Sequence, residues 1–143
     1  MRRVWLIPIC VGLLSCGGSK ETTVQQVFNV ELYSFGGISG RASGVTITGD
    51  GLALHWSGRS ANLRTVHDSV MVDPQSLEKI KSLVSSDEIY SISYERSGDI
   101  TTVLKIQWDD KLLQLSYADD RVPDSFPPAA KELIEEIQNL HTR

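Results

Sequence analysis

The hydrophobic pattern of the chain changes period at Asp73-Pro74, and this change constrains the fold more than any other sequence feature. Upstream, apolar residues alternate with polar ones on both sides of the glycine-rich turn 49–51, which is typical of a β-hairpin. Downstream, apolar residues recur at helical spacing, at Leu77, Ile80, Leu83 and Val84. Asp is a good N-cap and Pro suits the first helical position, so a helix is expected from Pro74 to about Ser85.

The same alternation predicts further strands on both sides of this helix. A first strand is expected over 27–35, and residues 63–72 are expected to extend the sheet with Val66, Val70 and Val72 on one face. Alternation over 100–108 and 113–117, around a turn at Asp109-Asp110, predicts a second hairpin. A closing amphipathic helix is expected after Pro127-Pro128, with the apolar stripe Leu133, Ile134, Ile137 and Leu140.

Amphipathic helices that follow antiparallel strands can bury their apolar stripes against one sheet. The predicted fold is therefore α+β, an antiparallel sheet of about four to six strands with two amphipathic helices packed on one face. Residues 27–143 are expected to form a single domain. Trp56 is in phase with apolar neighbours and is expected in the core, whereas His55 alternates with them and is expected to face solvent.

The N-terminus carries Arg2 and Arg3, followed by an apolar run from Val4 to Leu14. This run of eleven residues is shorter than the roughly 18 to 20 apolar residues that a membrane-spanning helix needs. Charge, short apolar core and small residues near its end are the layout of a secretory signal peptide, which is expected over residues 1–15.

The segment Leu13-Leu14-Ser15-Cys16 resembles the lipobox of bacterial lipoproteins. The resemblance implies cleavage between Ser15 and Cys16, a diacylglycerol thioether on the Cys16 sulfur, and an acyl chain such as palmitate on the new amino group. It also implies a lipid anchor in the cell envelope, in the outer membrane or on the outer face of the inner membrane. Residues 16–26 would then be the lipidated cysteine and a flexible tether. The alternative is an ordinary secreted protein with a chance cysteine.

The charge of the chain disfavours nucleic acid as a partner, and its cysteine content disfavours a disulfide bond. Arg2 and Arg3 are two of the 14 basic residues, and the chain has 18 acidic ones, so the cleaved chain carries a formal charge of −6. This charge disfavours nucleic acid as a partner. Cys10 lies in the segment that would be removed, and Cys16 would be alkylated, so no disulfide is expected.

No catalytic or cofactor motif is evident in the sequence. It has no Gly-x-Ser-x-Gly elbow, phosphate-binding loop or dinucleotide fingerprint, and its three histidines lack metal-ligand spacing. His67-Asp68 with Ser57, Ser60 or Ser69 could form a triad, but sequence neighbours on a strand point to opposite faces. We therefore expect no catalytic residues, no bound metal and no cofactor, and we expect that the protein is not an enzyme.

The remaining candidate is the loop Gly36-Gly37-Ile38-Ser39-Gly40-Arg41, in which three glycines free the backbone and Ile38 can be presented to a partner. The alternative is a bulged strand connection that binds nothing. The order of an early strand, Gly-Gly-hydrophobic-x-Gly, a helix, a hairpin and a closing helix resembles the emfourin family of small inhibitors of thermolysin-like metalloproteases. Gly36, Gly37, Ile38 and Gly40 carry the glycine motif.

These observations together predict a membrane-anchored lipoprotein with a non-catalytic domain that binds a protein. The emfourin resemblance implies that the protein partner is a metalloprotease and that the domain inhibits it through residues 36–41. The alternative is a structural or assembly lipoprotein of the cell envelope without inhibitory activity. The sequence does not indicate an oligomeric state.

Overall fold

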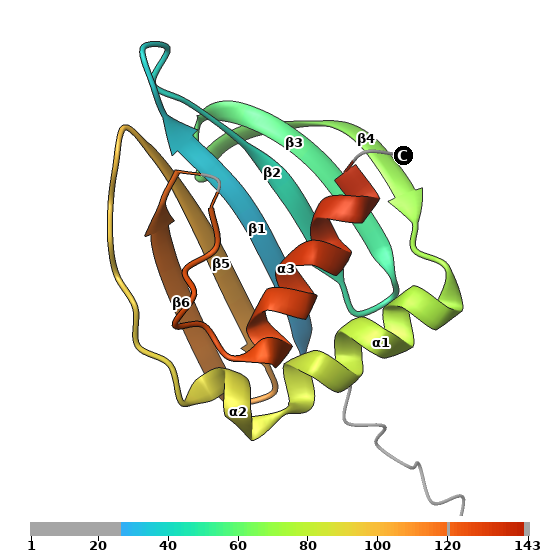
Figure 1. Cartoon of the computed structure of the whole chain (residues 1–143). Coiled ribbons are helices and arrows are strands. Elements are labelled where there is room, and N and C mark those ends of the chain that lie inside the picture. Colours follow the sequence, from blue (N-terminus) through green and yellow to red (C-terminus); the bar gives the residue numbers. More distant parts are fainter. Residues whose placement is uncertain (1–26, 120, 142–143) are drawn as a thin grey trace, which may run out of the picture.

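The computed structural model describes residues 27–119 and 121–141, so the expected signal peptide, the lipidation site Cys16 and the tether lie outside the described residues. The elements are β1 (Phe28–Gly36), β2 (Arg41–Thr48), β3 (Leu52–Ser60), β4 (Leu63–Met71), α1 (Pro74–Ser85), α2 (Asp87–Tyr90), β5 (Ile100–Trp108), β6 (Lys111–Ala118) and α3 (Pro128–His141). Figure 1 shows their arrangement.

The strands form one antiparallel sheet with the order β4-β3-β2-β1-β5-β6. β1 lies near its centre and pairs along its length with β2 and β5, so that Leu32 is opposite both Val45 and Leu104. The expected α+β class, the antiparallel sheet and the number of strands are confirmed. The pairing of β1 with β5 joins the four-stranded meander β1–β4 to the β5–β6 hairpin.

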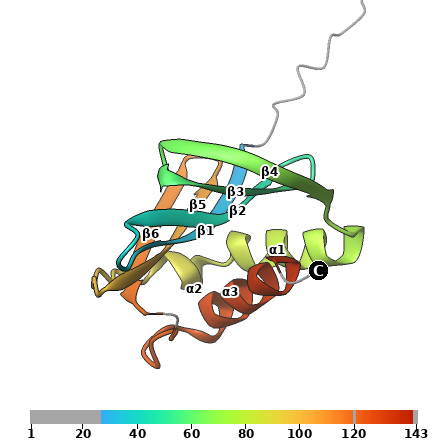
Figure 2. The same cartoon turned by 90° about the horizontal axis from the view of Figure 1, so that it is seen from above.

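In the part of the chain that the structure describes, three helices accompany the sheet, and Figure 2 shows them on the same side of it. Asp73 caps α1 as expected, because its side chain accepts a hydrogen bond from the Ser76 amide, and Pro74 is the first helical residue. On the surface, Lys79 of α1 forms ion pairs with Glu132 and Glu136 of α3. The hydrophobic pattern predicts two helices but not α2, because α2 is a single turn of four residues that is too short to show a period.

The main core lies between the sheet and the helices. Its fully buried side chains come from the inner face of the sheet and from all three helices, and include Val30, Ile47, Leu104, Ile106, Tyr117, Ile80, Val84, Ile89, Leu133, Ile134 and Ile137. The apolar stripes predicted for α1 and α3 supply a large part of this set.

A smaller cluster is buried on the outer face of the sheet, where Trp56 is only 2% exposed and packs against Tyr33 with ring centroids 5.6 Å apart. Polar groups cover and orient the indole. Its Nε1 donates to Thr46 Oγ1 at 3.1 Å, and the Arg64 guanidinium lies 4.7 Å from the ring centroid. Arg64 also pairs with the nearly buried carboxylate of Glu31. The centre of the sheet is therefore buried on both faces.

Two predictions about side-chain direction are wrong: Val66, Val70 and Val72 do not all share one face, and His55 does not lie on the face turned away from the helices. The register of the strands explains both. β4 carries one extra residue near His67, a β-bulge, so that Val66 is opposite Trp56 on the outer face while Val70 is opposite Ala53 on the inner face. His55 is opposite the core residue Val45 and lies on the helix side. The prediction placed Trp56 in the core and therefore its neighbour His55 toward solvent. Trp56 is instead buried in the cluster on the outer face, so His55 lies on the helix side.

Replacing Leu133 with alanine should lower the free energy of unfolding by about 3 kcal/mol, because it opens a cavity at a fully buried position between α3 and the sheet. Urea unfolding followed by circular dichroism measures this. The control is Glu135→Ala on the exposed face of α3, which should change stability by less than about 0.5 kcal/mol. Equal effects of the two changes would contradict the packing described here.

Candidate functional site: the tip of the β1–β2 hairpin

The six residues of the predicted binding loop comprise the last residue of β1, the turn 37–40 and the first residue of β2, and we call Gly36–Arg41 the hairpin tip. Figure 1 shows that the tip projects beyond the rest of the sheet. Gly36, Gly37 and Gly40 have φ of 117°, 66° and 59°, in the left-handed region that glycine adopts most readily. The Gly40 amide donates to the Gly37 carbonyl at 3.2 Å and closes the turn.

The base of the tip is fixed to the segment that leads into β5. The Gly37 amide donates a 2.7 Å hydrogen bond to the Asp99 carbonyl. At Gly36 the two backbones approach so closely that a Cβ atom would lie 2.2 Å from the same carbonyl oxygen. Only glycine fits this position. The turn is therefore held not only by its own strands but also by the segment at Asp99, which is distant from it in sequence.

Apolar side chains surround this turn. Ile38 is fully exposed at its end, and Phe35 and Ile100 are each about two-fifths exposed at its base. Register places Ile100 opposite Gly36, so it adjoins the turn. Phe35, like Tyr33, lies on the outer face of the sheet, whereas Ile100, like Leu104, lies on the helix face. Single exposed apolar residues are ordinary, but a fully exposed one at a projecting end, with an apolar residue on each side of its base, is an arrangement that can contact another protein.

The glycine pattern predicts the turn itself, but it does not indicate that Phe35, Asp99 and Ile100 are parts of the site. Phe35 was assigned simply as the end of a strand. Asp99 and Ile100 reach the tip only through the pairing of β1 with β5, which no local pattern reveals. The sequence offered one signal, the apolar residue Ile100 directly after the polar and glycine-containing segment 95–99.

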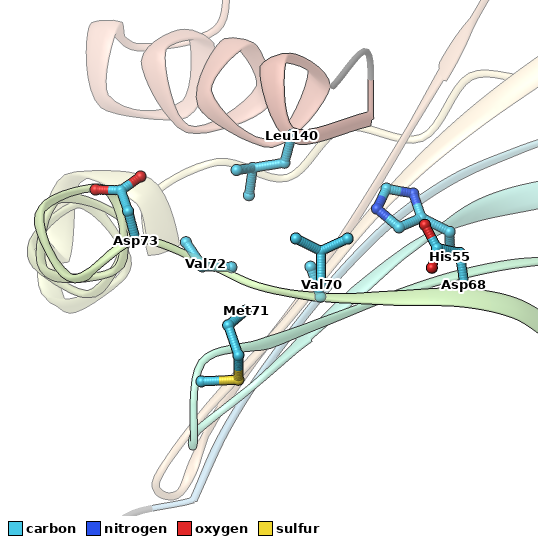
Figure 3. Close-up of a pocket in the computed structure, with 8 residues that line it drawn as sticks. His55, Asp68, Val70, Met71, Val72, Asp73 and Leu140 are labelled. Carbon is cyan, nitrogen blue, oxygen red and sulfur yellow. The ribbon is translucent and has the colours of Figure 1, made fainter.

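The helix side of β3 and β4 holds a second feature, an apolar cavity of about 310 Å³. Its lining residues are Ala53, His55, Asp68, Val70, Met71, Val72, Asp73 and Leu140. Figure 3 shows the side chains of His55 and Asp68 next to each other at one end of it. These two residues are register partners on β3 and β4.

The serine and histidine residues considered for a triad are only partly brought together. Ser57 Oγ lies 2.5 Å from His67 Nε2, but this pair is exposed to solvent and is not among the residues that line the cavity. Asp68 adjoins His55, and one of its oxygens accepts a 2.8 Å hydrogen bond from the Ser69 amide. An exposed serine and histidine alone provide neither a substrate pocket nor an oxyanion site.

The perturbed titratable groups lie on the scaffold, away from the tip. A hydrogen bond from Thr48 lowers the pKa of Asp50 in the β2–β3 turn. The hydrogen bond and charge of Lys111 lower the pKa of Asp87, and burial raises the pKa of Tyr90. Each shift has a structural cause, and none marks a reactive group beside Ile38.

Two properties of the described chain bear on metals and membranes. Across residues 27–119 and 121–141, no three His, Cys, Asp or Glu side chains gather where they could hold a metal ion. Within the same ranges, no helix has both the length and the apolar character needed to cross a membrane.

No protein-family model matches the chain, and no curated protein matches it.

Replacing Gly36 with alanine should destabilise the domain by about 2 kcal/mol, because the new methyl group collides with the Asp99 carbonyl at a positive φ. Gly40→Ala is the matched control. It has a positive φ in the same turn, but its Cβ would meet nothing within 4 Å, so it should cost only about 1 kcal/mol. Urea unfolding of both variants tests the difference. A cost for Gly40→Ala that equals or exceeds that of Gly36→Ala would contradict the proposed contact.

Proposed function

We propose that this protein is a lipid-anchored, non-catalytic binding domain that engages a protein partner through the hairpin tip. The observation that carries the proposal is the full exposure of Ile38 on a turn whose base is fixed to Asp99. An apolar side chain held in place loses little conformational freedom on binding, so more of its burial energy appears as affinity. Phe35 and Ile100 flank the base of the tip, one on each face of the sheet, where the walls of a concave partner site would contact them.

The scaffold suits this role. In this proposal α1 and α3 are the two amphipathic helices that stiffen the sheet from one face, and the outer cluster around Trp56 stiffens it from the other. Both layers leave the tip uncovered. A projecting turn on a rigid sheet can enter a concave site on another protein, such as an enzyme cleft.

The most concrete version of this function is inhibition of a thermolysin-like metalloprotease, which the resemblance to the emfourin family implies. The glycines that carry the resemblance have a physical role here, because Gly36 permits the close approach to Asp99 and Gly37 supplies the bond to it. Inhibition by an inserted turn needs no catalytic group in the inhibitor. We propose that the anchor places this inhibitor at the cell envelope, where secreted proteases act.

Titration of thermolysin with the purified protein should give stoichiometric inhibition, and Ile38→Asp should weaken it by at least about 30-fold. A hot-spot side chain of this kind contributes about 2 kcal/mol or more, and a buried charge there has no partner. The measurement is residual peptidase activity against inhibitor concentration.

Leu112→Asp is the matched control, because Leu112 is also an exposed apolar residue, 74% accessible, but lies beside the turn at the opposite end of the sheet. It should inhibit like the unmodified protein. Equal inhibition by the Ile38→Asp variant would exclude the tip as the binding site. No inhibition by any of the three proteins would exclude inhibition of thermolysin and favour the assembly lipoprotein.

Lipidation at Cys16 should be directly detectable. Expressed in bacteria with labelled palmitate, the unmodified protein should take up label and partition into the detergent phase, because two or more acyl chains anchor a protein stably. Cys16→Ser should abolish both properties, since the thioether requires a thiol. Cys10→Ser, the control at the other cysteine, should retain both. Label in the Cys16→Ser variant would contradict the assigned anchor.

A further inference from the structure

The two edges of the sheet differ in how they are covered. Along β6, the segment 94–96 forms backbone hydrogen bonds to Ser116, one of 2.9 Å and one of 3.1 Å. On the opposite edge, β4 pairs only with β3 among the described residues, and all nine of its residues are exposed. An edge strand of this length presents backbone donors and acceptors that another chain can pair with.

The side to which each backbone N–H and C=O group of β4 points can be deduced from the hydrogen bond at the end of the strand. The Val72 amide donates to the Gly51 carbonyl at 2.9 Å, toward the β2–β3 turn. Because successive residues of an antiparallel strand direct their backbone groups to opposite sides, those of Met71 and Ser69 point away from β3. The Asp68 carboxylate accepts from the Ser69 amide at 2.8 Å, and an incoming strand can replace this bond.

The apolar cavity lies beside this uncovered edge, on the helix side. Val70 of β4 and Val72, just beyond the end of β4, form one wall, and Leu140 of α3 lies opposite them, as Figure 3 shows. Val70 is 51% exposed although it points toward this cavity. A strand added to β4 would place every second side chain on this side of the sheet, so that one of them could fill the cavity.

Carboxylates lie at both ends of the cavity. Figure 3 shows Asp68 beside His55 at one end and Asp73 at the other. The whole chain is also acidic, with a formal charge of −4. A ligand with a basic side chain near the Asp68 end complements this rim.

We propose that residues 68–72 at the β4 edge bind an extended segment of a partner protein by antiparallel strand addition. The segment carries an apolar side chain opposite Val70, another opposite Val72, and a lysine or arginine opposite Asp68. This surface is separate from the hairpin tip. The bulge at His67 confines regular pairing to this part of the strand. Residues 68–72 contain no lysine or arginine, so a second copy paired there would bring no basic side chain opposite Asp68.

The test uses the full-length chain in mild detergent and a panel of peptides Thr-Val-Thr-X-Thr-Z-Thr, with X as Leu, Ile or Phe and Z as Lys or Glu, each with fluorescein on the N-terminus and an amidated C-terminus. Fluorescence anisotropy should give a Kd on the order of 100 μM for the best lysine peptide. Its glutamate counterpart should bind about threefold to fivefold more weakly. Amide chemical shifts should change most at Ser69 and Met71.

Val70→Asp should weaken binding by at least about tenfold, because it places a charge in the apolar wall. Leu63→Asp, at the far end of the same strand and 70% exposed in the unmodified chain, should bind normally. The proposal is wrong if none of the six peptides binds at about 1 mM. It is also wrong if Val70→Asp leaves affinity unchanged, or if the chain forms a dimer through β4 that no peptide dissociates.

Discussion

The close approach of the β1–β2 turn to the Asp99 carbonyl is the constraint on which the functional site depends. A hydrogen bond from the Gly37 amide holds the two segments together, and the absence of a side chain at Gly36 lets them meet. Without this contact the turn would be an ordinary hairpin loop, attached only through its own strands. With it, the turn belongs to the three-stranded centre of the sheet, and Ile38 has a defined position.

That centre is stiffened from both faces. On β1, Leu32 faces the helices, while its neighbour Tyr33 packs against Trp56 in the outer cluster. Residues buried on both sides of a strand open only by global or large-scale unfolding. The outer cluster combines an apolar centre with the buried Glu31 carboxylate, which is acceptable because Arg64 and Thr46 both reach it. The tip extends from this rigid region rather than from an edge strand.

The sequence predicted the elements well and their spatial arrangement less well. Alternation and capping gave both hairpins, the start of α1 at Pro74 and the stripe of α3, because these signals are local. Side-chain direction failed at His55 and Val66, since a bulge and a second buried cluster break simple alternation. The binding loop was found from its glycines, whereas its brace at Asp99 depends on the non-local pairing of β1 with β5. The cavity beside β4 was not predicted, because it forms between Val70 and Leu140, which are distant in sequence.

Amide hydrogen exchange at Gly37, measured by NMR on the full-length protein, tests the central claim most directly. The claim is that the tip is held rigidly by its bond to Asp99. Gly37 should then exchange at least about 100-fold more slowly than the amide of Ile38 in the turn, since exchange requires that the bond opens. Exchange of Gly37 at the rate of Ile38 would contradict the claim, because the turn would then be a mobile loop and Ile38 would have no fixed position.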